Sequence, residues 1–148
     1  MSAERYTLDA NIIFYALDAD ASRKHMIAQA LLHAALRNDC VLTLQALAET
    51  YHAISRKAPS RVEESSHILE DLASFVPVVH ADFKAFTDAM HGQRTRRTQF
   101  WDTMLWATAK KHGCKIILTE DAQDRPQIGG VRYLDPFRAS SSELQPFL

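Results

Sequence analysis

Residues 115–124 read KIILTEDAQD, in which a short apolar segment leads directly into three acids within five residues. The apolar part, residues 116–118, has the length and the branched side chains of a buried β-strand. In an α/β sheet, ligands bind beyond the carboxyl ends of the strands. The stretch therefore predicts a buried strand and a polar site at the edge where that strand ends.

Other segments of the chain resemble this strand in length and composition: residues 5–9, 41–44, 76–79 and 131–134. Patterns typical of helices lie between most of them, at residues 27–35, 47–54, 60–74, 81–91 and 100–112. Short strands that alternate with helices predict an α/β fold. We expect a three-layer sandwich in which helices flank a central, largely parallel, short-stranded sheet.

The size and composition of the chain are those of one folded domain. Its 148 residues are 47% hydrophobic and 24% charged, which argues against disorder. We expect one domain over residues 1–137, with a polar, basic connection at residues 92–98 and a loose, serine-rich tail at residues 138–148. Cys40 and Cys114 belong to no CxxC motif and each begins an apolar segment, so we expect buried free thiols.

The charge balance and the N-terminal sequence bear on partners and location. A net charge of −1 means that any binding of nucleic acid has to come from a local patch. The first residues lack the pattern of a signal peptide, and the sequence contains no apolar run of membrane length. We therefore expect a cytoplasmic protein.

Four acids are placed to meet at one edge of the predicted sheet. Asp9 ends the first strand, Glu49 lies early in the helix after the second, and Asp121 follows residues 116–118. Strand and helix order alone puts these three at the carboxyl edge. Asp102, near the start of the helix at residues 100–112, reaches that edge if its helix runs antiparallel to the next strand, as in a βαβ crossover.

Asp102 carries the strongest local argument, because its helix is apolar on nearly every side and should be buried. No basic residue lies within four positions of it, so the carboxylate caps the helix, pairs with a distant base or holds a metal. Glu49 lies opposite the apolar stripe of its helix and either faces water or joins the site. Asp9 and Asp121, taken singly, also fit turn residues. Their common edge is what argues for a shared role.

Carboxylates that converge on one point repel each other unless a cation compensates. A ligand set of oxygens alone suits Mg²⁺ or Mn²⁺, whereas zinc favours histidine or cysteine. His52, three residues after Glu49, is the histidine closest to these acids, and we expect it to be exposed or satisfied in the core. A pocket of this kind indicates hydrolysis of a phosphodiester by a metal-activated water.

Several motifs follow one another along nearly the whole chain: LDAN at residues 8–11, QALAETY at 45–51, FWDTMLWATA at 100–109, LTEDAQD at 118–124 and GGVRYLDP at 129–136. In their residues and their order they resemble the PIN-domain ribonucleases, most closely the VapC-like toxins of bacterial type II toxin–antitoxin systems. The resemblance implies a Mg²⁺-dependent endoribonuclease that cleaves RNA such as tRNA, rRNA or mRNA and is held inactive by an antitoxin.

The resemblance also implies the site residues. Catalysis and metal binding fall to Asp9, Glu49, Asp102 and Asp121. Supporting polar positions are Asn11, Thr119 and Asp124. We expect Asp9 and Asp102 to hold the principal ion, Asp121 to complete its site or bridge a second ion, and Glu49 to orient or deprotonate the attacking water. Glu120 is expected to point away from the site.

RNA has to be attracted to an acidic site, and arginines near it could contact phosphates: Arg94, Arg96, Arg97 and Arg125. The alternative is a solvated polar loop without a role in binding. Trp101 and Trp106 could stack on bases, but we expect both to be buried in the core.

The resemblance further suggests a homodimer, and an antitoxin on the first helices near Phe14, Tyr15, Leu17, Met26 and Ile27, residues that also fit ordinary core positions.

Two alternative functions compare with the nuclease, and the second is the less favoured. One is a catalytically silent PIN-like module that only binds proteins, which intact acids argue against. The other is a phosphorylatable receiver-type signalling domain, which needs an acidic pair after the first strand and a lysine after the last. Asp9 is followed by Ala10, and the last strand is followed by Asp135 and Pro136, so that pattern fails.

Overall fold

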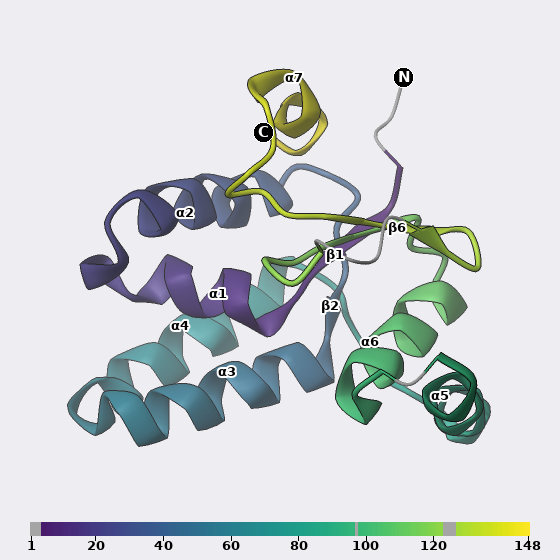
Figure 1. The fold of residues 1–148 in the computed structure, drawn as a ribbon. Helices are drawn as coiled ribbons and strands as arrows, with labels where there is room; N and C mark the ends of the chain where they lie inside the picture. The colour runs from purple at the N-terminus through teal and green to yellow at the C-terminus, as the bar shows by residue number, and fades with distance from the viewer. Residues whose placement is uncertain (1–3, 97, 123–126) are drawn as a thin grey trace.

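The strands of the computed structural model, which describes residues 4–96, 98–122 and 127–148, form a central and mostly parallel sheet (Figure 1). β1 (Tyr6–Leu8), β4 (Ile116–Leu118), β6 (Val131–Leu134) and β5 (Gln127–Ile128) lie side by side in that order. β2 (Leu42–Thr43) pairs with β3 (Val78–Val79), and a bridge between Tyr6 and Cys40 joins this pair to β1. Among the described strand pairs, only β5 with β6 is antiparallel.

Helices cover both faces of this sheet, which confirms the predicted α/β sandwich (Figure 1). One face carries α1 (Ala10–Leu17), α2 (Arg23–Ala35), α3 (Leu44–Lys57) and α4 (Val62–Phe75). The other carries α5 (Phe83–Arg96) and α6 (Phe100–Lys111). Short turns of 3-10 helix occur at η1 (Ala19–Ala21), η2 (Pro59–Arg61) and η3 (Gln145–Phe147), and α7 (Ser141–Leu144) lies near the C-terminus.

β4 shows how the sequence produces the two layers of core. Side chains alternate between the faces of a strand. Ile116 and Leu118 accordingly belong to the cluster under α1–α4, whereas Ile117 belongs to the cluster under α5 and α6. All three are buried, and complete burial of such a side chain stabilises the fold by about 1.5–3 kcal/mol. A continuous apolar strand is therefore required at this position.

Side-chain caps begin α1 and α3, which leave the carboxyl edge of the sheet after β1 and β2. The Asp9 carboxylate accepts a hydrogen bond from the backbone N–H of Ala10 at 2.7 Å at the start of α1. The Thr43 hydroxyl accepts one from Ala46 at 3.0 Å at the start of α3. Polar side chains at these positions stop each strand and start the next helix within one residue.

Several predicted boundaries differ from the structure. Leu44 is the first residue of α3 and not the last of a strand. Residues 92–96, expected within a connection, form the end of α5. Gly92 is buried against α6, where an added Cβ would lie 2.7 Å from the Thr103 methyl carbon, so close helix packing requires glycine and overrides its low helix propensity.

The prediction of a loose C-terminal tail is wrong. Ser140 and Glu143 form a reciprocal capping box at the start of α7. Leu144 and Phe147 are buried, and the Phe147 ring meets the Tyr6 ring edge to face at 4.9 Å. The serines suggested disorder, but these apolar side chains anchor the segment to the core.

The cysteines are as predicted: Cys40 and Cys114 are free thiols, and both are buried. Within the described parts of the chain, no helix is both long enough and apolar enough to cross a membrane.

Candidate active site

The centre of the site is a hydrogen bond between residues 110 positions apart, Asp9 and Thr119. Leu8 of β1 pairs with Leu118 of β4, and the Asp9 N–H donates to the Leu118 carbonyl at 2.9 Å. This register places the next side chains of the two strands together at the carboxyl edge. The Thr119 hydroxyl donates to Asp9 Oδ2 at 2.8 Å, while Asp9 Oδ1 accepts from Ala10.

Asn11, in the first turn of α1, connects this pair to the loop after β4. Its Nδ2 donates to Thr119 Oγ1 at 3.3 Å and to Asp121 Oδ2 at 3.4 Å. Its Oδ1 accepts from the Glu120 N–H at 3.4 Å. The Asp121 N–H in turn donates to Thr119 Oγ1 at 3.2 Å. Asp9, Asn11, Thr119 and Asp121 thus form one hydrogen-bonded network at the carboxyl edge, where strand order placed Asp9 and Asp121.

Glu49 and Asp102 approach the site from the helices on opposite faces of the sheet. Both line one cavity of about 710 Å³ between the starts of α3 and α6. Gln45, one turn before Glu49, donates from Nε2 to Glu49 Oε1 at 2.8 Å and to the Trp101 carbonyl at 2.9 Å. The amide thereby links the two helices that carry these acids.

The electrostatics of Asp9 reflect this convergence. Burial raises the pKa of its carboxyl to about 6, and the negative charges of Glu49 and Asp102 act in the same direction. The hydrogen bonds from Thr119 and Ala10 oppose the rise in pKa. A partly buried carboxylate with acidic neighbours favours a compensating cation.

The acidic side chains of the site carry the oxygen ligands that Mg²⁺ or Mn²⁺ prefers. In the described parts of the structure they are not yet close enough together to hold an ion. Asp9 Oδ1 accepts a hydrogen bond from Ala10 and Oδ2 accepts one from Thr119, and each oxygen has a further lone pair that a hard cation can use. The side chains of Glu49 and Asp102 supply further oxygens, which are close enough to Asp9 to raise its pKa. Across the described ranges, however, no three acids, histidines or cysteines stand in an arrangement that could hold a metal ion. Asp124, predicted as a supporting residue, lies outside these ranges.

The family model for the PIN domain matches residues 6–125, which include all of the predicted acids. The chain belongs to the PIN-domain family. Ribonuclease VapC1 of Aquifex aeolicus is 26% identical over 126 residues, which are 82% of this chain and 84% of that protein.

Solved structures confirm the PIN fold. VapC20 of Mycobacterium tuberculosis, a sarcin–ricin loop cleaving toxin, aligns with a TM-score of 0.65 at 18% identity over 86% of this chain and 98% of its own. A chain of the DNA-bound VapBC complex of Salmonella typhimurium aligns with a TM-score of 0.66 at 15% identity over 90% of this chain and 98% of its own.

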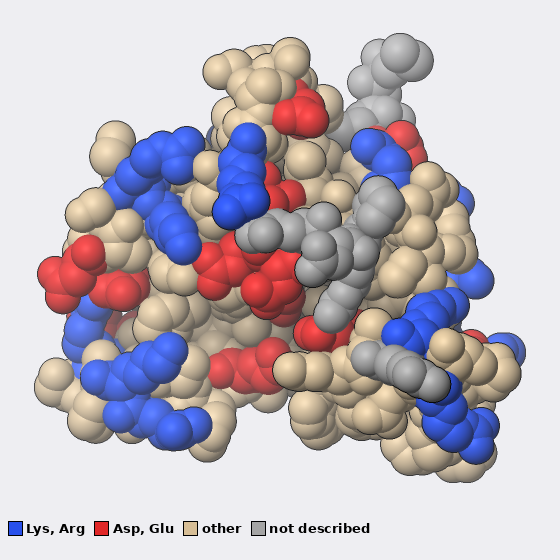
Figure 2. Space-filling view, viewed as in Figure 1, with Lys and Arg blue, Asp and Glu red and all other residues tan. Residues whose placement is uncertain are grey.

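Of the four arginines predicted to contact RNA, the structure describes Arg94 and Arg96. Arg94 and Arg96 are exposed in the last turn of α5, and the Arg96 guanidinium lies 4.3 Å from the centroid of a Trp106 ring. Arg97 and Arg125 lie outside the described residues. Figure 2 shows acidic side chains gathered across the middle of one face, with basic side chains on either side. RNA contacts by these arginines stay a prediction.

One tryptophan is buried and the other is exposed, contrary to the expectation that both lie in the core. Trp106 is 6% exposed and donates to the Ile128 carbonyl, whereas Trp101 is 60% exposed at the cavity of Glu49 and Asp102. Sequence reasoning also missed Gln45, although its spacing of four residues from Glu49 on a helix was a usable signal.

Glu120 contacts α1 and α2 through its side chain. It accepts hydrogen bonds from the Tyr15 hydroxyl and from Lys24 Nζ, both at 2.9 Å. These contacts hold the loop after β4 against the helices, a role that the sequence did not suggest.

Proposed function

We propose that this PIN domain is a Mg²⁺-dependent endoribonuclease and the toxin of a toxin–antitoxin pair. The observation that carries the proposal is the partly buried Asp9 carboxylate, hydrogen-bonded to Thr119 and raised in pKa by burial and by the charges of Glu49 and Asp102. The relative named Ribonuclease VapC1 supports RNA as the substrate. Mn²⁺ is an alternative ion of the same chemistry.

Each acid of the site has a proposed task. Asp9 and Asp102 hold the principal ion, and Asp121, positioned by Asn11, completes its site or bridges a second ion. A divalent ion bound there supplies an activated water and stabilises the charge that develops on the phosphate. Glu49, oriented by Gln45, is placed to direct that water or to take its proton.

The decisive experiment measures RNA cleavage by the protein freed of any partner, with Mg²⁺, with Mn²⁺ and with chelator. Total tRNA, rRNA and mRNA serve as substrates. We expect metal-dependent cleavage that Asp9→Asn and Asp102→Asn each abolish. If the folded wild-type protein cleaves none of these RNAs, the silent protein-binding module becomes the better assignment.

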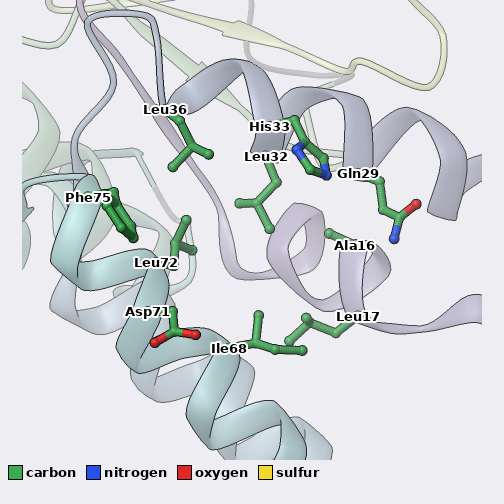
Figure 3. Close-up of a pocket in the computed structure, with 10 residues that line it drawn as sticks. All are labelled: Ala16, Leu17, Gln29, Leu32, His33, Leu36, Ile68, Asp71, Leu72 and Phe75. Atoms are coloured by element: carbon green, nitrogen blue, oxygen red, sulfur yellow. The ribbon is translucent and has the colours of Figure 1, made fainter.

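A groove between α1, α2 and α4 is the proposed antitoxin site (Figure 3). It has a volume of about 340 Å³ and is mainly apolar, with Leu17 from α1, Leu32 from α2, Leu36 directly after α2, and Ile68 and Phe75 from α4. Leu36, Ile68 and Phe75 are exposed. An exposed apolar groove rimmed by polar side chains is typical of a protein-binding site.

The occupant that we propose is an apolar segment of the antitoxin. Solved structures with this fold include VapBC assemblies and a toxin–antitoxin complex from Klebsiella pneumoniae, which support such a partner. Of the residues predicted at this surface, Leu17 lines the groove, Phe14, Tyr15 and Ile27 are partly buried against the core, and Met26 is exposed outside the groove. A homodimer and a cytoplasmic location belong to the same proposal, and light scattering of the purified toxin tests the first.

A further inference from the structure

The cavity beside Glu49 and Asp102 extends well beyond the acids. Its lining includes Leu44 and Gln45 from α3, and Trp101 and Met104 from α6. We call it the Trp101 pocket. Because Glu49 and Asp102 belong to its wall, the pocket opens directly onto the proposed site of phosphodiester hydrolysis.

The apolar surface of the pocket is open to solvent. Trp101 is 60% exposed and Leu44 is 54% exposed, although both lie in the first turn of helices that pack on the sheet. Phe100 supports the indole from one side, with ring centroids 5.1 Å apart in an edge-to-face arrangement. An exposed tryptophan next to a catalytic acid offers a flat surface for stacking.

Gln45 adds an unsatisfied polar atom to this lining. Its Nε2 donates to the Glu49 carboxylate and to the Trp101 carbonyl, and these acceptors fix which end of the amide is the nitrogen. Its Oε1 is buried and, within the described part of the chain, accepts no hydrogen bond. A buried acceptor of this kind is costly, and an incoming N–H donor relieves it.

We propose that the Trp101 pocket binds an unpaired nucleobase of the RNA, stacked on the Trp101 indole, beside the phosphate at the acids. A base offers a flat π-face for Trp101 and ring or amine N–H groups for Gln45, and proteins recognise single-stranded RNA through such stacking and edge contacts. A second copy of the chain fits this surface less well, because charged side chains such as Glu49 and Asp102 are depleted at the centres of protein interfaces. The assignment rests on the proposed ribonuclease function.

Binding is tested in the Asp9→Asn background, so that RNA stays intact. The probes are single-stranded oligonucleotides of A, C and U and an abasic oligomer of the same length, titrated while tryptophan fluorescence and anisotropy are followed. Trp101→Ala should weaken binding of the base-containing oligomers about tenfold and abolish the quenching. Trp101→Phe should retain most of the affinity, and the abasic oligomer should not distinguish the variants.

Phe83→Ala is the matched control, because Phe83 is also an exposed aromatic in the first turn of a helix but does not line the pocket. With active protein, Trp101→Ala should raise KM and change the bases found at the cleavage position, with a smaller effect on kcat. The inference fails if Trp101→Ala binds and cleaves as Phe83→Ala does. It also fails if Trp101→Ala only converts a dimer to monomers while RNA affinity per protomer is unchanged.

The outcome also separates this inference from the proposed function. Cleavage by the wild type without quenching by base-containing RNA overturns the pocket and leaves the nuclease intact. Quenching that depends on the bases, in a wild-type protein that cleaves no RNA, supports the pocket and overturns the nuclease.

Discussion

The carboxyl edge of the sheet and the groove between α1, α2 and α4 are built in opposite ways. At the edge, a few polar atoms are fixed by hydrogen bonds between residues far apart in sequence, such as Asp9 and Thr119. The groove is a surface of apolar side chains from three helices, which acts through its area. Replacement of a single atom should therefore disable the edge, whereas the groove should require an inserted charge.

The largest expected effect follows from Asp9→Asn. The amide keeps the shape of the side chain but removes the charge that would bind a cation, so metal-dependent cleavage should fall by roughly three powers of ten. Initial rates on a labelled RNA measure this effect. Asp39→Asn, which removes an exposed carboxylate paired with Arg5 at the opposite edge of the sheet, should leave the rate unchanged. Equal rates for the two variants would falsify the assignment of Asp9.

The same variant should be more stable than the wild type at neutral pH in chelator. The pKa of Asp9 is raised to about 6, so the folded state holds a proton that the unfolded state releases near pH 4. Wild-type stability should fall for this reason as pH rises from about 4 to 6. Asp9→Asn lacks the effect and should gain about 3 kcal/mol well above pH 6 and nothing below pH 4.

Urea unfolding from pH 4 to pH 8 measures this gain, with Asp39→Asn again as the control. A difference between Asp9→Asn and wild type that does not change with pH would contradict the raised pKa. Added Mg²⁺ should stabilise the wild type and not Asp9→Asn, because a ligand of the folded state alone increases stability.

The contrast between edge and groove also explains what the sequence could predict. Asp9 and Asp121 follow the paired strands β1 and β4 closely, so the order of strands and helices was enough to expect both at the same edge. The groove gathers Leu17, Leu36 and Phe75 from separate helices, and the periodicity of one helix does not reveal how three helices meet.

Trp101 shows a second limit of sequence reasoning. The apolar sequence at residues 100–112 predicts burial of the whole helix. In the structure, α6 packs into the core through residues 103 and 105–109, whereas Trp101 in its first turn is exposed at the pocket. The contact of Gln45 with the Trp101 carbonyl and that of Glu120 with Tyr15 were missed for a related reason, since both partners lie far away in sequence.

Phe75→Asp should weaken partner binding at the groove and leave RNA cleavage at the carboxyl edge unchanged. Phe75 is 75% exposed at the end of α4, so the fold tolerates the change, but the charge has to be desolvated when an apolar segment binds. Affinity for the proposed antitoxin partner should fall about 30-fold or more, while RNA cleavage by the protein without that partner is retained. Isothermal titration calorimetry measures the affinity.

Phe83→Asp controls for the introduced charge, because Phe83 is equally exposed but lies outside the groove. Loss of binding in both variants would argue against the groove as the antitoxin site.

Thr119→Val sharpens the description of the edge. The change keeps the buried shape but removes the donor to Asp9 and the acceptor used by Asn11 and by the Asp121 N–H. The pKa of Asp9 should rise further, and the rate should fall about tenfold near pH 6 and recover partly at higher pH. Thr119→Ser keeps the hydroxyl and should restore the pH–rate profile. A profile of unchanged shape in Thr119→Val would mean that the hydroxyl does not influence Asp9.

The smallest effect is expected for Glu120→Gln, next to the site in sequence. Glu120 directs its carboxylate to Tyr15 and Lys24, and the ion pair with Lys24 is partly exposed, so its loss should cost less than about 1 kcal/mol of stability. The Gln oxygen can still accept from Tyr15 and keep the loop in place. The cleavage rate should change by no more than about twofold, whereas Asp121→Asn, one residue further on, should lower it strongly. A large loss in Glu120→Gln would instead mean that the charge holding this loop against α2 is needed to position Asp121.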